Sequence, residues 1–527
     1  MARLCEVTVD TADVVQRRFG GVGFHVSHHL HATTQEHFDE VLAKRWRELA
    51  PSFARLGYRL SDGEEGLATL GDHLVRLRDT GTEVYLVTWD PEDVEPGPPM
   101  QDYARRIADQ LHYLVRERGA ANVRYYCMTN ELTLHRWADM VDDMPRFRAY
   151  HRALFDAMRE RGLPVGLLAS DASPIENWQT IGWAAEQMDD VTAVYGGHHY
   201  FNEHDPADPA FYPWFLEKLR RGAGLARARG KDFILGEFGC RQDLGTRDGR
   251  RMDVCTHFGT PREPLVGMQL AEAVLAALNG GVRALANWTF TDYPDSYRPD
   301  YVNRWGAFRW EGDHATRAHY YAYGLLTRFF RGPATAFAVH TAEPLVRGAA
   351  VRHHDAPSGS VALVNRCAED VPISLAISGE RLDARFRKYV YDPADVPQHP
   401  FGDLQQPSGV VPMSDGRLAD VLGAGTLAVY TTACSEDRPA PVEGLEVKEG
   451  GEGRRLLQWQ ACPSADLCYY RAYRGPTLDF VPGVATQIGS TTATRLLDRG
   501  WRSAGPCCYK VLAVNRSGNA GAPAVAT

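Results

Sequence analysis

Long apolar runs are missing from this sequence of 527 residues, and none approaches the length of a membrane-spanning helix. The first ten residues also lack the apolar core of a signal peptide and are expected to start a strand. We therefore expect no membrane partner and a cytoplasmic location, with secretion as the alternative if a signal has been removed. Nothing in the sequence indicates the oligomeric state.

A basic stripe is missing as well, because the net charge of −9 is spread along the chain, and this argues against a nucleic-acid partner. The ten cysteines show no CxxC or Cys/His spacing of the zinc type, so we expect no metal and no cofactor. We interpret the cysteines as buried free thiols of a reducing compartment. In a secreted chain, Cys462 and Cys468 could instead pair with Cys507 or Cys508.

Hydrophobic residues make up 44% of the chain and charged residues 24%, as in ordinary globular proteins, and the length predicts two to four domains. Between residues 18 and 315, short apolar runs alternate with amphipathic stretches such as 103–114, which is typical of parallel strands covered by helices. Eight strand–helix units predict an α/β fold with one closed (β/α)8 TIM barrel. The eight runs are 23–26, 52–56, 83–89, 123–131, 166–171, 193–200, 233–237 and 282–288.

The rest of the chain reads as β-structure. Alternating segments separated by Gly, Pro and Asp predict a β-sandwich over 316–434, which the N-terminal strand within 1–17 is expected to join. A linker is expected at 435–441. Residues 442–527 resemble a fibronectin type III domain, a β-sandwich of about this length. For this last module we favour a structural role over a spacer or a weak glycan contact.

Two glutamates end predicted strands: Glu131 closes the fourth apolar run and Glu237 closes the seventh. The C-terminal ends of the strands are where (β/α)8 barrels carry their catalytic groups. Hydrolysis of a glycosidic bond usually requires two carboxyl groups on either side of the bond, and two carboxylates at one barrel mouth can meet this requirement. We therefore interpret this pair as the candidate catalytic centre.

Other strand ends supply residue types suited to a sugar ring. Aromatic faces can carry the apolar face of the ring, whereas amides and imidazoles bind its hydroxyls. The candidate substrate-binding residues are His25, Arg55, Trp89, Asn130, His198, His199, Tyr200 and Trp288. Trp178 and Tyr293 lie near loops after the fifth and eighth strands and are read either as aromatics of an outer subsite or as packing residues.

The pair Asn130-Glu131 on the fourth strand, Ile234–Gly239 on the seventh and Trp288 on the eighth resemble the clan of retaining (β/α)8 glycoside hydrolases. The trailing β-sandwich makes the layout similar to family 39, with its β-xylosidase and iduronidase types, and to the related families 5, 30, 51 and 79. The resemblance covers about residues 1–434. The Trp and Pro that usually surround the Asn-Glu pair are absent, since Met128-Thr129 precede it and Leu132-Thr133 follow it.

The resemblance implies a role for each matched residue. Glu131 is expected to be the acid/base, with a pKa raised by burial and by the charge of Glu237, which is expected to be the nucleophile. Arg55 and Tyr200 are expected to keep Glu237 ionised, and Asn130 to bind the hydroxyl next to the anomeric carbon. The implied activity is retaining hydrolysis of an O-glycosidic bond through a covalent glycosyl-enzyme intermediate, exo-acting on a short glycan, with carbohydrate as the partner.

Alternative interpretations stand beside these. Arg55 could be a plain salt-bridge partner of the barrel. Only one of His198 and His199 can face the barrel mouth, because adjacent strand residues point to opposite faces. The loop at 240–265, with Asp253 and His257, is read as a wall of the cleft or as a solvent-exposed loop. The competing functions are a non-catalytic carbohydrate-binding barrel and a metal-assisted hydrolase, for which the sequence offers no suitable His/Asp cluster.

Overall fold

The computed structural model describes all of the chain except residues 1–3, 27–33, 60–61, 89–96, 133–141, 202, 241–242, 248–249, 254–262, 295–301, 304, 311, 379–383, 452 and 502–506. Its centre is a ring of eight parallel strands that follow one another in chain order and close where the last strand pairs with the first. The strands are β1 (Cys5–His25), β2 (Phe53–Tyr58), β3 (Glu83–Thr88), β4 (Val123–Cys127), β5 (Gly166–Ala172), β6 (Val194–Tyr200), β7 (Asp232–Gly239) and β10 (Ala284–Asn287). The predicted α/β class and TIM barrel are confirmed.

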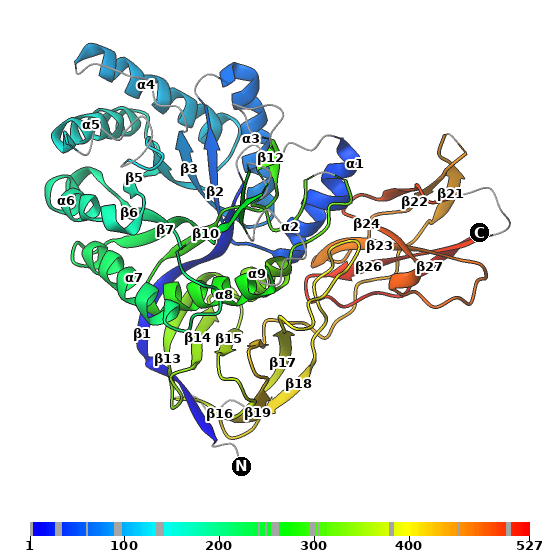
Figure 1. Cartoon of the computed structure of the whole chain (residues 1–527). Coiled ribbons are helices and arrows are strands. Elements are labelled where there is room, and N and C mark those ends of the chain that lie inside the picture. Colours follow the sequence, from blue (N-terminus) through cyan, green and yellow to red (C-terminus); the bar gives the residue numbers. More distant parts are fainter. Residues whose placement is uncertain are drawn as a thin grey trace.

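Helices follow the barrel strands and form an outer layer around the ring (Figure 1). A hairpin of β8 (Asp243–Arg247) and β9 (Arg250–Asp253) stands between β7 and its helix, and a short ladder of β11 (Tyr293–Pro294) and β12 (Val302–Asn303) follows β10. The helices are α1 (Gln35–His37), α2 (Ala43–Leu49), α3 (Gly63–Asp79), α4 (Pro98–His112), α5 (Met144–Glu160), α6 (Gln179–Gln187), α7 (Phe211–Arg227), α8 (Glu263–Gly280) and α9 (Ala318–Phe329).

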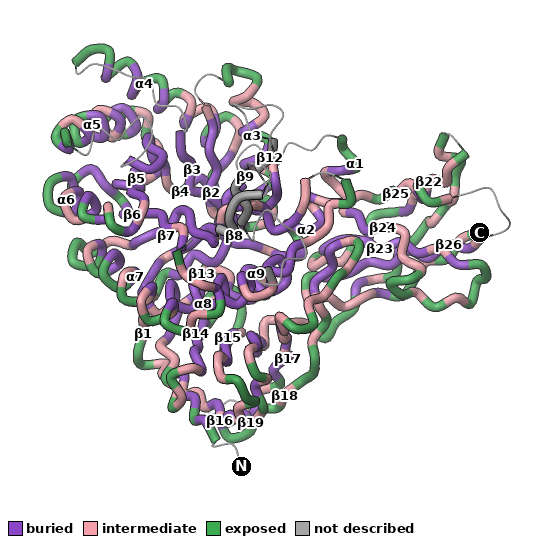
Figure 2. Tube along the Cα trace, viewed as in Figure 1, coloured by how far each residue is buried: buried purple, intermediate pink, exposed green. Residues whose placement is uncertain are grey.

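The barrel has two distinct hydrophobic regions because strand side chains alternate between its faces. A small inner cluster includes Phe53, Val87, Leu168, Val194 and Ile234, which fill the lumen below the mouth. A much larger cluster packs the outer faces of the strands against the helices. Most residues of the barrel strands are accordingly buried, as Figure 2 shows in purple. The filled lumen leaves the carboxyl ends of the strands as the face on which polar groups gather.

Strand β1 belongs to two parts of the molecule. Its first residues pair with β16 (Val371–Ile377), and β13 (Arg331–Thr341) pairs with it from Val7 to Gly21. Its last residues pair with β2 and β10 in the barrel. The remaining strands of this β-region are β14 (Val346–His353), β15 (Gly359–Asn365), β17 (Ala384–Tyr391), β18 (Gly409–Met413), β19 (Arg417–Leu422) and β20 (Leu427–Thr431). The shared strand makes the β-region continuous with the barrel.

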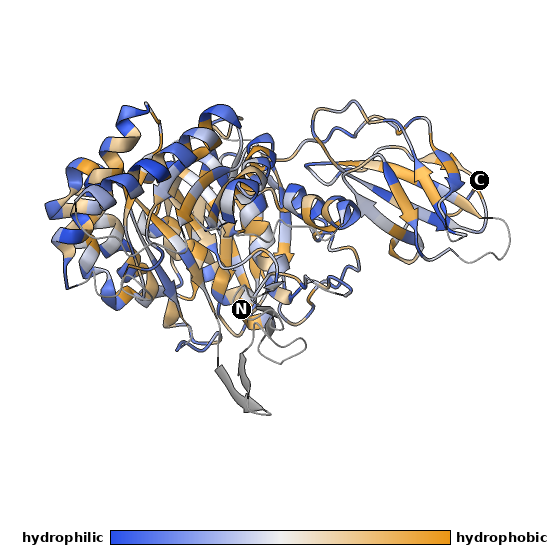
Figure 3. Cartoon of the chain, turned by 90° about the horizontal axis from the view of Figure 1, so that it is seen from above, coloured by the Kyte–Doolittle hydropathy of each residue, from blue (hydrophilic) through white to orange (hydrophobic). Residues whose placement is uncertain are grey.

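The C-terminal module consists of two further sheets around its own core, which includes Leu457, Trp459, Tyr470 and Val511. Figure 3 shows this module, which carries the C-terminus, to one side of the rest of the chain. One sheet holds β21 (Glu446–Glu449), β22 (Arg455–Gln458) and β25 (Arg495–Asp498), and the other holds β24 (Gln487–Thr491), β23 (Leu467–Gly475), β26 (Cys508–Asn515) and β27 (Ala524–Ala526). Its likeness to fibronectin type III stays a prediction.

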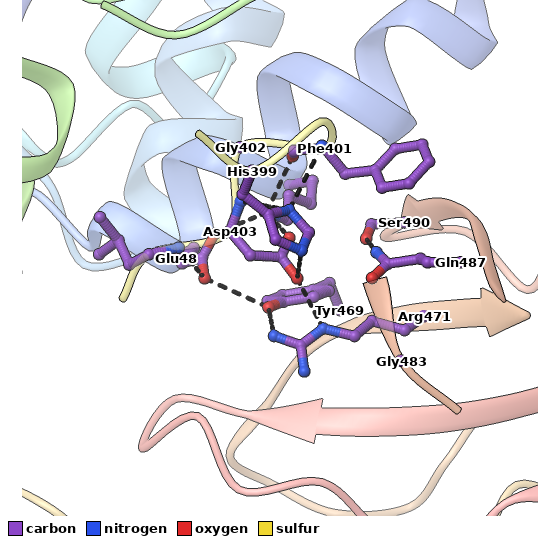
Figure 4. A network of polar contacts seen from close by, with 12 residues as sticks. Glu48, His399, Phe401, Gly402, Asp403, Tyr469, Arg471, Gly483, Gln487 and Ser490 are labelled. Carbon is purple, nitrogen blue, oxygen red and sulfur yellow. Dashed lines mark hydrogen bonds and ion pairs between the residues drawn. The ribbon is translucent and has the colours of Figure 1, made fainter. Parts of the chain in front are cut away.

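A buried ionic network joins this module to the barrel and the β-sandwich (Figure 4). Asp403, in the segment after β17, accepts from Arg471 Nε of β23 at 2.7 Å and is paired with Lys44 of α2. Lys44 also donates to Glu48 at 2.6 Å, and Glu48 accepts from Tyr469 Oη at 3.2 Å. These side chains come from three parts of the chain, so the module is held in one orientation by groups shielded from water.

In the part of the chain that the structure describes, no helix is long and apolar enough to span a bilayer. The nine cysteines described there are free thiols, and Cys462 and Cys468 are not paired with Cys507 or Cys508. Cys255 lies outside the described residues. The disulfide alternative for the C-terminal module is therefore wrong in this structure, in agreement with free, mostly buried thiols.

Candidate active site

Glu131, in the segment that follows β4, and Glu237, near the end of β7, lie together at the mouth of the barrel. The fourth strand therefore ends at Cys127, before the glutamate that was expected to close it. Both are buried, with 8% and 4% of their surface exposed. A carboxylate oxygen of Glu131 lies within 4.8 Å of one of Glu237. Glu131 adopts a left-handed backbone conformation with φ of 53°, which is uncommon for residues other than glycine.

The inward direction of Glu237 depends on an irregularity of β7. Leu235 pairs with Gly197 on one side and Leu285 on the other, but the next pairs are Glu237 with His198 and Phe238 with Asn287. Gly236 is skipped in both ladders, as in a β-bulge, which re-aims the side chain that follows it. Regular alternation from the inward Ile234 would place Glu237 on the helix side, so the bulge is what brings this carboxylate to the mouth.

Arg55 of β2 is the central cation of the site and is fully buried. Its Nη1 donates to Glu237 Oε1 at 2.5 Å, and its Nη2 donates to Asn130 Oδ1 at 2.7 Å. Tyr200 Oη donates to the other oxygen, Glu237 Oε2, at 2.6 Å. Both oxygens of Glu237 therefore accept a strong hydrogen bond, and the orientation of the carboxylate is fixed.

Burial raises the pKa of Glu237, and the nearby Glu131 adds to this effect. Arg55, His198 and the Tyr200 hydroxyl act in the opposite direction, because each favours the charged carboxylate. Glu237 is thus a desolvated carboxylate whose charge depends on its immediate cationic neighbours. Removing any one of them would shift its proton equilibrium toward the neutral acid.

The structure adds Asp171, a site residue that the sequence analysis passed over. It belongs to β5, has φ of 56° and is fully buried. Its Oδ2 accepts from Arg55 Nη2 at 3.1 Å, and its Oδ1 lies 2.8 Å from His198 Nε2. The available signal was that Asp171 ends the fifth apolar run of the sequence, just as the two glutamates end the fourth and seventh runs.

The adjacent histidines of β6 face opposite sides, as strand alternation requires. His198 points into the barrel, with Nδ1 3.3 Å from Glu131 Oε1. His199 lies on the helix side, where its ring packs against Trp214 and Phe215 of α7, and its Nδ1 accepts from the backbone N–H of Ile175. The structure therefore brings His198 into the site and leaves His199 out of it, because the register of β6 sends its side chain outward.

Aromatic rings form one side of the site. The His25 ring stacks on Trp288 with centroids 4.1 Å apart, and His25 Nδ1 lies 3.2 Å from Arg55 Nη1. Trp288 is half-buried and meets Tyr293 edge-on at 6.0 Å. Trp178 is instead a packing residue, since its Nε1 donates to the Ala172 and His198 carbonyls.

Some candidates cannot be placed. Trp89 and His257 lie outside the described residues, and the side chain of Asp253 is not among those described. The reading of the loop at 240–265 as a cleft wall therefore stays a prediction.

Glu131, His198 and Glu237 offer ligand atoms that all lie within 4.8 Å of one another. Arg55 already bonds to Glu237, and a guanidinium at this position repels a divalent cation. The arrangement suits proton transfer and nucleophilic attack by two adjacent carboxylates better than it suits a metal. The expectation of no metal stays a prediction.

Comparison with solved structures supports the fold of the chain. No protein-family model matches the chain, and no curated protein matches it in sequence. Among solved structures, the chain is similar to a glycoside hydrolase family 30 subfamily 8 xylanase from Clostridium acetobutylicum, with 13% identity, a TM-score of 0.56 and coverage of 81% of this chain and 99% of that one. The catalytic domain of a family 30 xylanase from Talaromyces cellulolyticus gives 12% identity, a TM-score of 0.57 and coverage of 81% and 99%.

A bacterial orthologue of human α-L-iduronidase matches over the whole length of both chains, with 13% identity and a TM-score of 0.60. This match extends over the C-terminal module as well as the barrel and the β-sandwich. At these identities the likeness shows that the chain has the fold of these (β/α)8 proteins with their attached β-domains.

Proposed function

We propose that this protein is a retaining glycoside hydrolase that cleaves O-glycosidic bonds through a covalent glycosyl-enzyme intermediate. The observation that carries the proposal is the distance within 4.8 Å between carboxylate oxygens of Glu131 and Glu237. Retaining enzymes hold their two carboxyl groups about 5–5.5 Å apart, whereas inverting enzymes need about 6.5–9.5 Å to admit a water. The names of the similar solved structures, two xylanases and an iduronidase, support the same class of reaction.

In this proposal Glu237 is the nucleophile, because Arg55 and Tyr200 bind both of its oxygens and favour its charged form. A Glu237 oxygen forms a bond to the anomeric carbon while the bond to the leaving oxygen breaks, and Glu131 gives its proton to that oxygen. A water then attacks the anomeric carbon and gives a proton to Glu131, and the ester to Glu237 breaks. Two displacements retain the configuration of the sugar.

The substrate is proposed to be a short glycan or glycoside attacked from its end. Asn130, held by Arg55, is the proposed partner of the hydroxyl next to the anomeric carbon. The stacked pair of Trp288 and His25 is the proposed floor of the first sugar subsite. A structural role is proposed for the C-terminal module, in view of its buried ionic contacts with the barrel.

The test is a panel of nitrophenyl pyranosides and furanosides, with proton NMR of the first-formed product to record its anomeric configuration. The wild type should hydrolyse at least one member with retention. Glu237→Gln should lose this activity by several orders of magnitude while its circular dichroism stays that of the wild type, because the amide keeps the shape of the side chain but cannot act as the nucleophile. Retained turnover in this variant would contradict the assignment of Glu237 as the nucleophile. A product of inverted configuration would contradict the retaining mechanism.

The same panel separates the competing functions. A carbohydrate-binding barrel would bind a glycan, as measured by calorimetry, without turning over any member of the panel. A metal-assisted hydrolase would lose activity in a chelator, whereas the proposed mechanism predicts no change.

A further inference from the structure

Asp171 links the two cations of the candidate site. One of its oxygens accepts from Arg55 and the other lies 2.8 Å from His198 Nε2. The carboxylate is fully buried, as is His198. A buried carboxylate must be paired to stay charged, and here its two partners are the guanidinium and the imidazole. Neither contact involves the two glutamates directly, so Asp171 acts on them through other side chains.

The second nitrogen of His198 faces both glutamates. His198 Nδ1 lies 3.3 Å from Glu131 Oε1 and 3.9 Å from Glu237 Oε2. A neutral imidazole has one donor and one acceptor nitrogen, whereas the imidazolium has two donors. Carboxylate oxygens lie next to both ring nitrogens of His198. The doubly protonated ring is therefore favoured, because each of its N–H groups then faces a carboxylate oxygen.

We propose that Asp171 is a positioning residue that holds His198 as an imidazolium, whose Nδ1–H stabilises whichever of Glu131 and Glu237 carries the negative charge. This inference rests on the proposed function. Before the first displacement Glu237 is the anion and Glu131 is the neutral acid. In the covalent intermediate Glu237 is an ester and Glu131 is the anion. His198 is placed within reach of both, so it need not move when the charge passes from one to the other.

The charges of the site balance throughout this cycle. Arg55 and His198 are positive, while Asp171 and one of the two glutamates are negative, so the sum is zero before and after the first displacement. A neutral sum matters because an unpaired charge in a desolvated site costs several kcal/mol. Without the proton on His198, the site would carry one uncompensated negative charge in both states.

The balance of the charges around His198 favours this assignment. Burial lowers its pKa, but Asp171 of β5 and Glu237 of β7 outweigh burial and the repulsion by Arg55 of β2, and raise its pKa to about 9. Despite burial, His198 and Arg55 lower the pKa of Asp171. Tyr85 of β3 has a pKa well above its ordinary value, so it is neutral.

The experiment compares the wild type with Asp171→Asn by NMR of protein labelled with 15N at histidine, with His198→Gln used to identify the His198 signals. In the wild type, both ring nitrogens of His198 should be protonated at pH 7. In Asp171→Asn the titration of His198 should move down by about 1–3 pH units, because the opposite charge is lost. This measurement requires no substrate, so it remains informative if the proposed glycosidase function fails.

The catalytic arm compares aryl glycosides with good and poor leaving groups, such as dinitrophenol and phenol. A His198 cation makes Glu131 a stronger acid, and a poor leaving group depends most on that acid. In Asp171→Asn and in His198→Gln, kcat/KM for the phenyl glycoside should therefore fall by about tenfold or more relative to the dinitrophenyl glycoside. A purely structural role would lower both rates equally and would overturn the proposal.

Asp403→Asn is the matched control, since Asp403 is also a buried aspartate between two cations but lies at the C-terminal module. It should leave both the His198 titration and the ratio of the two rates unchanged. Unchanged titration of His198 in Asp171→Asn would also overturn the proposal. If Asp171→Asn fails to fold, the protonation of His198 in the wild type and the rate ratio in His198→Gln decide the question.

Discussion

At the scale of single residues, Arg55 links several polar side chains of the candidate site. It bonds to Glu237, Asn130 and Asp171 and lies beside the His25 ring, with no exposure to solvent. A guanidinium can serve this many partners because its donors point in fixed directions in one plane. From the sequence, Arg55 could be either a site residue or a salt-bridge partner within the barrel. It is both in the structure, because its ion pairs are formed with residues of the candidate site.

Arg55→Met should destabilise the protein by about 3–5 kcal/mol, since the carboxylates of Glu237 and Asp171 would be left buried without their shared cation. The measurement is denaturant unfolding followed by circular dichroism at neutral pH. Arg78→Met provides the control, because this arginine is 41% exposed and its pair with Asp79 lies at the surface. A loss for Arg55→Met no larger than that of the control would contradict the buried network.

At the scale of elements, the bulge in β7 determines which way Glu237 points. Gly236 is the residue without a pairing partner in either neighbouring strand. Other side chains already occupy the space into which a side chain at this position would point. A Cβ there would lie 2.8 Å from His198 Nε2 and 3.2 Å from Tyr85 Cε1. The glycine therefore leaves the space that the His198 ring occupies, and the strand supplies both the nucleophile and the room for its neighbour.

Gly236→Ala should displace the His198 ring and reduce kcat/KM, with a cost of about 1–3 kcal/mol in stability from overpacking. Gly224→Ala is the control, because Gly224 lies on α7 and a Cβ added there would have no neighbour within 4 Å. That variant should gain up to about 0.5–1 kcal/mol from the loss of a glycine inside the last turn of the helix, with unchanged activity. Wild-type activity in Gly236→Ala would show that the site tolerates a shifted His198.

At the scale of the whole molecule, ion pairs contribute to the interface between the C-terminal module and the barrel. Asp403 stands between Lys44 and Arg471, and Arg499 of the module also pairs with Glu40 of the barrel at 2.6 Å. Burial raises the pKa of Asp403, but Lys44 and Arg471 outweigh it and bring the pKa to about 2. The contact therefore depends on this carboxylate staying ionised.

Asp403→Asn should lower the stability of the protein by about 3–5 kcal/mol at neutral pH, because two buried cations lose their shared anion. The folded pKa of about 2 is below the ordinary value of 3.8, so this stabilisation is present above pH 3.8 and is lost as the pH falls through 2. Unfolding curves at several pH values should show the difference from wild type shrinking in acid. Lys448→Ala, at an exposed pair within the module, should change little.

Sequence by itself determined the barrel, because eight apolar runs with helical stretches between them have only one common closed arrangement, and it placed both glutamates at strand ends. It determined neither the direction of Glu237, which depends on the bulge at Gly236, nor the choice between His198 and His199, which depends on strand register. The partners of Asp171 and of Asp403 were also decided by the tertiary structure alone. Both aspartates pair with cations from distant segments of the chain. The local sequence around a buried carboxylate does not indicate which cation will lie beside it in the folded protein.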